Sequence, residues 1–308
     1  MTKSQRKFFW SSVLLLSALI FVFLVITYFL SFVSMPTGLK FLIFLVLSAL
    51  LAVIITYAYT LTSSAISDAM TTLRRLSRAE NLSNPLMLRL SSEAPGTYHH
   101  SMNVSNLAQR AAKSINVDSL LVRIAAYYHD IGKLSDPKVY IENQSQSEIP
   151  HDENGAWIRN NVKKILAHVS EGVRIAREAG LPDEITELIA EHHGNTKALY
   201  FFEKAKEKGL KIRKTDFSYP GPKPQSKEAA IIMLADCVEA AARAQRDISR
   251  EAIANLVRNT IEEKLKEGQL SRAHFTDNDI LKIKDSLTET LLTIYHQRIS
   301  YEPKAAKA

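Results

Sequence analysis

Two uninterrupted apolar runs near the amino terminus constrain this chain more than any other feature. Residues 8–33 and 41–67 contain no charged side chain, and each run exceeds the roughly 20 apolar residues that a helix needs to cross a bilayer core. A cleaved signal peptide is the alternative for the first run, because three basic residues precede it. The apolar region of a signal peptide has only about 7–15 residues. The sequence therefore predicts a two-helix transmembrane hairpin over residues 1–65.

Basic residues flank this hairpin at its two ends rather than at its turn. They precede the first run, and Arg74, Arg75 and Arg78 follow the second, whereas the connector "SMPTGLK" carries only Lys40. Basic residues favour the cytoplasmic side of a membrane. We therefore expect a multi-pass protein of the cell membrane with two spans, with both termini and everything from about Ile66 onward in the cytoplasm.

The charge and cysteine content agree with that location. The chain has 39 basic and 32 acidic residues, a formal charge of +7, but the basic residues are dispersed among acidic ones and form no patch interleaved with aromatic residues. A surface beside the anionic lipid bilayer explains the excess, and no nucleic acid polymer is expected as a partner. One cysteine, Cys237, excludes an internal disulfide and fits a reducing compartment.

Residues 66–95 are expected to form a stalk helix and a linker. Apolar residues recur there at helical spacing, at Ile66, Met70, Leu73 and Leu76. The pattern is shorter than the three or four heptads of a coiled coil, which favours a stalk lying on its own domain, and a homodimer through the stalk or membrane helices is the alternative. Prolines and a glycine then interrupt the pattern, so we expect the globular domain to occupy residues 96–308.

Four helices of that domain present histidines where core residues belong. Helical spacing places His100 on an apolar face and turns His99 about 100° away. A second apolar helix runs directly into His129 and Asp130, with Gly132 placed to end it. A single histidine on an apolar face is more often a core residue than a metal ligand.

The third and fourth helices repeat the pattern. His168 shares an apolar face with its neighbours, and His192 and His193 close a helix just before Gly194. Adjacent residues diverge by about 100° on a regular helix, but the backbone loosens at a helix end enough for both rings to reach one ion.

A further helix, "SKEAAIIMLADCVEAAARA", is almost wholly apolar but contains Asp236. A buried carboxylate without a partner costs several kcal/mol, and a nearby metal ion removes that cost. The alternative is a salt bridge to Arg243 or another basic residue.

Together these residues supply seven nitrogen and oxygen donors, more than one tetrahedral zinc ion uses. Imidazole and carboxylate donors suit iron, manganese or zinc, and seven are enough for two ions if one carboxylate bridges them. A pair of ions about 3.5–4 Å apart is suited to phosphate ester hydrolysis. The candidate metal ligands are His100, His129, Asp130, His168, His192, His193 and Asp236.

The order of these residues resembles the HD-domain metal-dependent phosphohydrolases. The segments "EAPGTYHHS", "YYHDIGK", "YIENQ", "HH", "YPGPKPQSKE" and "MLAD" are similar to the cytoplasmic domain of the seven-transmembrane HD family of bacterial cyclic di-AMP phosphodiesterases, over about residues 80–302. The resemblance implies an all-α fold, an HD-domain helical bundle with a dinuclear metal centre, and two divalent ions, usually iron or manganese.

The resemblance also implies how the ligands divide. His100, His129, Asp130 and Asp236 would hold one ion, and His168, His192, His193 and the bridging Asp130 would hold the other. The expected reaction is hydrolysis of the second messenger cyclic di-AMP to linear pApA by a membrane-tethered enzyme.

Lys133 joins Asp130 as a catalytic candidate. One helical turn beyond the ligands, it would place a positive charge on a phosphate oxygen, and the alternative is a solvated cation at a helix end. The rigid loop at residues 220–224 could wall a nucleotide pocket, with Lys223 or Lys227 near phosphate, or could be a plain connector.

Two departures from related enzymes bear on the substrate and on the membrane part. Enzymes that open cyclic di-GMP carry a Gly-Tyr-Pro motif after the paired histidines, and "HHGNTKALYFF" lacks it, which favours the adenine dinucleotide. Two spans are predicted where the family has seven, so we expect a naturally short form or a fragment.

The alternative functions are hydrolysis of another nucleotide, such as cyclic di-GMP, an alarmone or a nucleotide monophosphate, and a non-catalytic, membrane-bound dinucleotide receptor.

Overall fold

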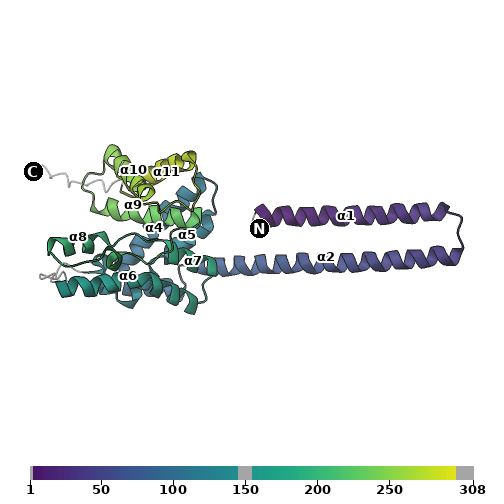
Figure 1. Ribbon diagram of the computed structural model, residues 1–308, viewed down its shortest axis with the longest axis horizontal. Helices are drawn as coiled ribbons and strands as arrows, with labels where there is room; N and C mark the ends of the chain where they lie inside the picture. The colour runs from purple at the N-terminus through teal and green to yellow at the C-terminus, as the bar shows by residue number, and fades with distance from the viewer. Residues whose placement is uncertain (1–2, 145–154, 296–308) are drawn as a thin grey trace, which may run out of the picture. The chain divides into compact units, whose positions relative to one another are not determined.

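The computed structural model describes residues 3–144 and 155–295, and most of these residues are helical (Figure 1). No β-strand forms among them, and their one isolated bridge pairs Lys197 with Ser218. The prediction of an all-α fold is therefore confirmed. The chain divides into two compact units, Met1–Arg75 and Leu76–Ala308.

The first unit is a helical hairpin of α1 (Lys3–Phe32) and most of α2 (Thr37–Glu80). The two helices pack through Phe23 and Phe44, whose ring centroids lie 6.1 Å apart. Lys40 Nζ donates a hydrogen bond to Ser31 O at 3.2 Å across the turn. Within α2, Thr37–Ser64 is long and apolar enough to cross a membrane, and the apolar segment of α1, Leu16–Phe32, is shorter.

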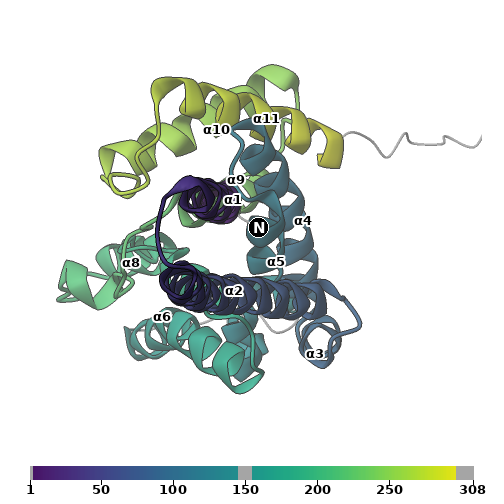
Figure 2. The ribbon, with the colours of Figure 1, turned by 90° about the vertical axis from the view of Figure 1, so that its right-hand side faces the viewer.

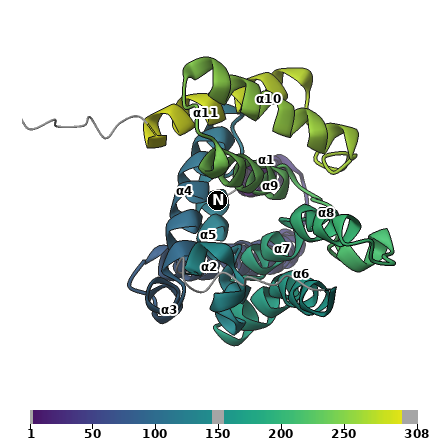
Figure 3. The same ribbon diagram turned by 90° about the vertical axis from the view of Figure 1, so that its left-hand side faces the viewer.

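The second unit is a helical bundle around one main core. After the end of α2 it contains α3 (Pro85–Glu93), α4 (Pro95–Ser114), α5 (Ser119–Tyr128), the 3₁₀ helices η1 (Ile131–Ser135), η2 (Pro137–Val139) and η3 (Ile141–Asn143), α6 (Gly155–Glu178), α7 (Asp183–Glu191), α8 (Leu199–Glu207), η5 (Lys214–Phe217), α9 (Lys227–Ala244), α10 (Arg250–Lys266) and α11 (Asp277–Tyr295). Helix α4 packs against α5, α9 and α11, and α6 packs against η1 and α7. Helices α10 and α11 lie at one end of this unit and α6 at the other, with α9 between them (Figures 2 and 3).

Side-chain caps fix where the helices that lead to the site begin. Asp118 Oδ1 accepts hydrogen bonds from the amides of Leu120 and Leu121 at the start of α5. Ser226 Oγ accepts one from the amide of Ala229 at the start of α9. Such caps satisfy amides that have no partner within the helix and contribute about 1 kcal/mol each. The caps fix the residues at which α5 and α9 begin, and therefore the positions of the polar residues that these helices carry to the site.

The second unit includes residues that the sequence assigns to the linker. Leu86, Met87 and Leu90 of α3 are buried in the main core, and Tyr128 donates a hydrogen bond to Ala79 O at 2.7 Å. Pro85 and Pro95 begin helices rather than interrupting one, because the first turn of a helix needs no amide donor from proline. Residues 76–95 therefore form part of the bundle.

Candidate metal centre

The structure brings all seven predicted ligands together in the interior of the bundle. His100 comes from α4, His168 from α6 and Asp236 from α9, while His129 and Asp130 follow α5. The paired histidines follow α7. All are buried except His193, whose side chain is 20% exposed. His99, by contrast, lies on the exposed side of α4, as the helical spacing predicts.

Asp130 lies between two groups of imidazoles, and each of its oxygens faces one group. Oδ2 lies 3.3 Å from His129 Nε2 and 3.5 Å from His100 Nε2. Oδ1 lies 3.3 Å from His168 Nε2 and 3.8 Å from His192 Nε2. The donor atoms of Asp130, His168, His192 and His193 lie within 4.8 Å of one another, as do those of His100, His129 and Asp130.

Asp236 also faces both groups. Its Oδ1 lies 3.0 Å from His100 Nε2 and 3.9 Å from His129 Nε2, and its Oδ2 lies 3.7 Å from His193 Nδ1. The alternative of a salt bridge from Asp236 to Arg243 is wrong, since Arg243 Nη2 pairs with Glu239 Oε2 at 2.7 Å. The buried carboxylate is therefore surrounded by imidazoles, as in a metal site.

Two buried polar atoms in this cluster have no hydrogen-bond partner, and both belong to predicted ligands. They are His129 Nε2 and Asp130 Oδ1. An unsatisfied buried polar atom costs about 1–3 kcal/mol, and more where it is charged. Divalent cations coordinated at these atoms would remove that cost, so the donor set fits a divalent metal centre.

Backbone carbonyls orient three of the imidazoles toward the cluster. The Nδ1–H groups of His129, His168 and His192 donate to Ala126 O, Ile165 O and Ile189 O at 2.7, 2.5 and 2.7 Å. A proton held on Nδ1 leaves the Nε2 lone pair free for a cation.

The charge states of the cluster suit metal binding. Burial lowers the pKa of His192 to about 3 and lowers the pKa values of His168 and His193, so these rings are neutral. Burial alone would raise the pKa of Asp130, but the charge of Lys133 and the neighbouring histidines hold it well below its usual range. His168, His192 and His193 thus present neutral imidazoles beside an ionised carboxylate, the forms that bind metal. His100 differs, because hydrogen bonds to Asp236 and Glu239 raise its pKa to about 9.

The helix ends at the site differ from the prediction in one respect. Helix α5 ends at Tyr128, and Gly132 lies inside the 3₁₀ helix η1 rather than ending α5. A Cβ atom at Gly132 would lie 1.8 Å from His168 O, so the glycine serves the close approach of η1 to α6. Helix α7 ends at Glu191, and Gly194 follows the two histidines with φ +54°, as the sequence predicts.

Lys133 is not a solvated helix-end cation. Its Nζ lies 2.8 Å from Asp130 Oδ2 and 2.6 Å from Glu142 Oε1, and 5.0 Å from the centroid of the Tyr140 ring. Burial alone would lower the pKa of Lys133, but these two carboxylates raise it above its usual value. The ammonium group is therefore charged and held at the edge of the cluster.

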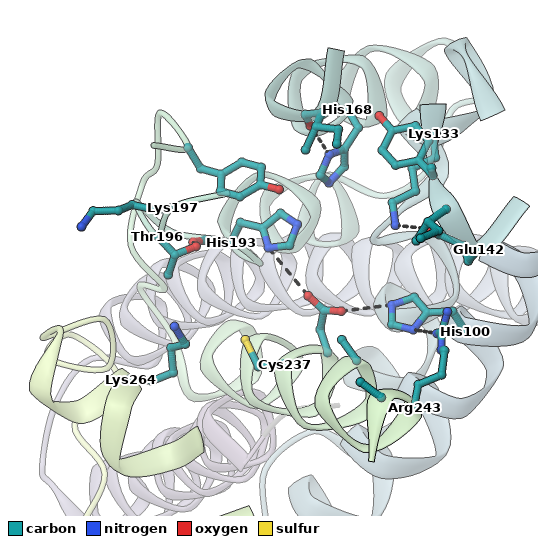
Figure 4. Close-up of a pocket in the computed structure, with 17 residues that line it drawn as sticks. His100, Lys133, Glu142, His168, His193, Thr196, Lys197, Cys237, Arg243 and Lys264 are labelled. Atoms are coloured by element: carbon teal, nitrogen blue, oxygen red, sulfur yellow. Dashed lines mark hydrogen bonds and ion pairs between the residues drawn. The ribbon is translucent and has the colours of Figure 1, made fainter. Parts of the chain in front are cut away.

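A pocket of about 520 Å³ opens beside the cluster. Figure 4 shows His100, His168 and His193 on its walls, with Lys133 and Arg243 near one side and Lys197 and Lys264 near the other. The volume lies within the range of about 300–1,000 Å³ that is typical of small-molecule sites. The metal centre is therefore accessible to a ligand.

The proline-rich loop contributes an aromatic wall and no cation to this pocket. Tyr219 lines it and stacks on His193, with ring centroids 4.1 Å apart. Lys223 Nζ donates to Gly268 O at 2.9 Å, and Lys227 pairs with Asp279 at 2.7 Å. Neither lysine lines the pocket, because both side chains tie the loop and the start of α9 to the α10–α11 region.

Sequence reasoning missed two carboxylates beside the cluster. Glu142 pairs with Lys133, and Glu239 lies 2.5 Å from His100 Nδ1. Glu239 is three residues beyond Asp236, on the same face of an apolar helix, and this spacing could have revealed it. Glu142 lies in short 3₁₀ structure, where no periodicity marks a buried face.

The sequence and fold of this chain are similar to those of known proteins. A family model described as HD domain matches residues 97–241. The crystal structure of the Listeria monocytogenes phosphodiesterase PgpH HD domain in complex with cyclic di-AMP is 41% identical, with a TM-score of 0.65, and the match covers 70% of this chain and all of that one. The chain belongs to the HD-domain family.

Curated full-length proteins extend the comparison. The cyclic-di-AMP phosphodiesterase PgpH of Bacillus subtilis is 42% identical over 233 residues, which cover 76% of this chain and 32% of that protein. The cyclic-di-AMP phosphodiesterase PgpH of Listeria monocytogenes is 41% identical over 230 residues, 75% of this chain and 32% of that protein. The match thus spans about a third of the length of these relatives.

Proposed function

We propose that this protein is a metal-dependent phosphodiesterase that hydrolyses cyclic di-AMP to linear pApA. The observation that carries the proposal is the position of Asp130, whose two carboxylate oxygens face two separate groups of imidazoles beside an open pocket. This arrangement supports a two-metal centre, which would be suited to phosphate ester hydrolysis. The similarity to HD domains named as cyclic-di-AMP phosphodiesterases supports the choice of substrate.

The proposed ligands divide as the resemblance implies. His100, His129 and Asp236 hold one ion, and His168, His192 and His193 hold the other, with Asp130 shared between the two. Iron or manganese is the proposed metal, because both accept mixed imidazole and carboxylate ligands. Asp236 Oδ2 faces His193, so this aspartate also borders the second group.

Residues of this chain position the nucleotide around the centre. When bound, the ions supply water activation and neutralise phosphoryl oxygens. Lys133, charged and 13% exposed at the pocket, donates hydrogen bonds to an oxygen of the reacting phosphodiester and stabilises the charge that develops there. Tyr219 holds the ring of His193 by stacking and excludes water from that side.

We further propose that residues 1–65 anchor this activity to the bacterial cell membrane with two spans, that residues 66–95 connect the anchor to the catalytic part, and that residues 96–308 carry the metal centre. The long apolar segment of α2 and the shorter one of α1 support this division. Both chain ends lie in the cytoplasm in this proposal. Ile66, Met70 and Leu73 are exposed on α2, and a homodimer would cover this stripe.

The test is hydrolysis by the full chain in detergent micelles, purified without oxygen and supplied with Mn²⁺ or Fe²⁺. Cyclic di-AMP and cyclic di-GMP are offered in parallel, and the product is identified by chromatography. The proposal expects pApA, and its loss in Asp130→Ala but not in Asp136→Ala, a control aspartate whose partner is the exposed Lys164. Preferential cleavage of cyclic di-GMP, or binding of cyclic di-AMP without cleavage by metal-loaded protein, would overturn it.

A further inference from the structure

Glu239 is a buried carboxylate that the proposed chemistry does not use. Its side chain is 1% exposed, and burying an ionised carboxylate is costly unless it is paired. Its Oε2 accepts a hydrogen bond from His100 Nδ1–H at 2.5 Å. The other nitrogen of the same ring, Nε2, faces Asp130 and Asp236. His100 therefore stands directly between Glu239 and the cluster.

This contact distinguishes His100 from three other imidazoles of the cluster. His129, His168 and His192 each donate Nδ1–H to a backbone carbonyl three residues earlier. His100 donates to the carboxylate of a residue 139 positions away. A carbonyl orients an imidazole, whereas a carboxylate also makes it a stronger electron donor to a metal.

Neighbouring side chains fix the position of Glu239. Arg243 Nη2 donates to Oε2 at 2.7 Å, and Asn103 Nδ2 donates to Oε1 at 3.2 Å. Arg243 Nη2 also lies 2.8 Å from His100 Nδ1, because both donors converge on one carboxylate oxygen. Glu239 and Arg243 lie four residues apart on α9, and Asn103 lies one turn beyond His100 on α4. The carboxylate is therefore held from two helices before any metal binds.

We infer that Glu239 is a positioning residue that strengthens metal binding through His100, and only at the ion that His100 holds. The inference rests on the proposed two-metal function. Glu239 fixes the proton of His100 on Nδ1 and directs the Nε2 lone pair to the cation. Among the described residues, His168, His192 and His193 have no carboxylate within hydrogen-bond distance of Nδ1, since Asp236 Oδ2 lies 3.7 Å from His193 Nδ1. The two sites therefore differ in how strongly their ligands are supported.

The test is binding of Mn²⁺ alone to the full chain in detergent, by competition with a chelator, so no nucleotide is needed. Loss of a carboxylate behind a ligating histidine typically weakens metal binding roughly 10- to 100-fold. We expect Glu239→Gln to weaken one Mn²⁺ site by about this factor and to leave the other unchanged. Glu228→Gln, at the start of the same helix, is the matched control and leaves both affinities unchanged. Glu239→Asp, which keeps the charge, recovers part of the loss.

A double variant separates positioning from a general effect on the fold. In a His100→Ala background, Glu239→Gln should have no further effect on Mn²⁺ affinity. Equal losses in both backgrounds, equal weakening of the two sites, or unchanged affinity in Glu239→Gln would each overturn the inference. If Glu239→Gln does not fold, the comparison of Glu239→Asp with the parent in the two backgrounds decides the same point.

These outcomes are distinct from those for the substrate. Failure of the Mn²⁺ test leaves cyclic di-AMP hydrolysis standing. A protein that binds Mn²⁺ as expected but cleaves no cyclic di-AMP refutes the proposed substrate and leaves the role of Glu239 intact.

Discussion

Gly132 packs directly against the backbone of His168, so that a Cβ atom at Gly132 would lie 1.8 Å from His168 O and 2.5 Å from Gly172 N. Backbone atoms cannot turn aside as a flexible side chain can. The contact joins η1, which follows Asp130, to α6, which carries His168. The geometry of one half of the metal centre therefore depends on the absence of a side chain.

Gly132→Ala should destabilise the protein and separate Asp130 from His168. Overpacking typically costs about 1–3 kcal/mol and more where backbone must move, which lowers the melting temperature of a domain of this size by roughly 5–10 °C. Thermal unfolding followed by circular dichroism measures this. Gly38→Ala is the control, because nothing lies within 4 Å of the added Cβ. Equal melting temperatures for Gly132→Ala and the parent would contradict the contact.

Lys133→Ala should depress turnover while leaving metal content near normal. The ammonium lies at the pocket beside Asp130 and Glu142 but carries no lone pair for a cation. Loss of one preorganised donor to a developing charge commonly costs about 10²- to 10³-fold in kcat. Initial rates with cyclic di-AMP and metal analysis of the same samples test this, with Lys164→Ala as the surface control. Loss of bound metal would remove Lys133 from its proposed catalytic role.

Asp130→Asn should remove more metal than any single histidine substitution. The two oxygens of Asp130 face the two imidazole groups. His168 belongs to one group, and its Nε2 lies 3.3 Å from Asp130 Oδ1. We expect Asp130→Asn to lose both Mn²⁺ ions at micromolar metal and His168→Ala to retain one. Metal stoichiometry after gel filtration measures the difference. Retention of one tightly bound ion by Asp130→Asn would show that Asp130 is not shared.

Metal binding should strengthen as pH rises from about 6.5 to 9. Burial alone would lower the pKa of His100, but hydrogen bonds to Asp236 and Glu239 raise it to about 9, so the metal-free protein carries a proton that a metal must displace. The raised pKa of His100 also stabilises the metal-free fold. This stabilisation is fully present below about pH 6.5 and is lost as the pH rises through about 9, which lowers the free energy of unfolding by up to about 3 kcal/mol.

Chemical denaturation of metal-free protein and Mn²⁺ titration across this pH range test the two halves of that prediction. The free energy of unfolding should fall with pH as the Mn²⁺ affinity rises. His100→Asn should flatten both dependences. A metal affinity independent of pH would show that His100 is already neutral in the metal-free protein.

Helical periodicity predicted most of the ligand set because each ligand lies on or directly after a buried helix face. It distinguished His100 from His99, and it marked Asp236 because no other acidic residue lies within the most apolar stretch of α9. It misread Gly132, since the atom that requires a glycine there belongs to His168, on a helix that begins 23 residues later. The residues around Gly132 do not indicate a contact with a helix that lies elsewhere in the sequence.

The partners of the ligands were harder to predict than the ligands. Glu142 and Glu239 belong to a residue type that is mostly solvent-exposed. Glu142 is largely covered because it pairs with Lys133 of η1, and Glu239 is buried because it pairs with His100 of α4 as well as with Arg243 on its own helix. The role of Pro85 and Pro95 was also hard to predict, because these prolines begin helices once α3 has a core to pack against. These features depend on tertiary partners, which one sequence does not identify.

Carboxylate partners limit the positive charge that the basic side chains of the pocket offer to a ligand. Lys133, Arg243 and Lys264 line the pocket, and each already has a carboxylate partner, in Glu142, Glu239 and Glu267. These three side chains therefore offer a phosphodiester little uncompensated positive charge. Lys197 also lines the pocket and, among the described residues, contacts the Phe202 ring rather than a carboxylate. In the proposed function, the divalent ions and Lys197 would therefore supply most of the charge that attracts a nucleotide, so binding of the messenger would depend strongly on the supply of metal in the cell.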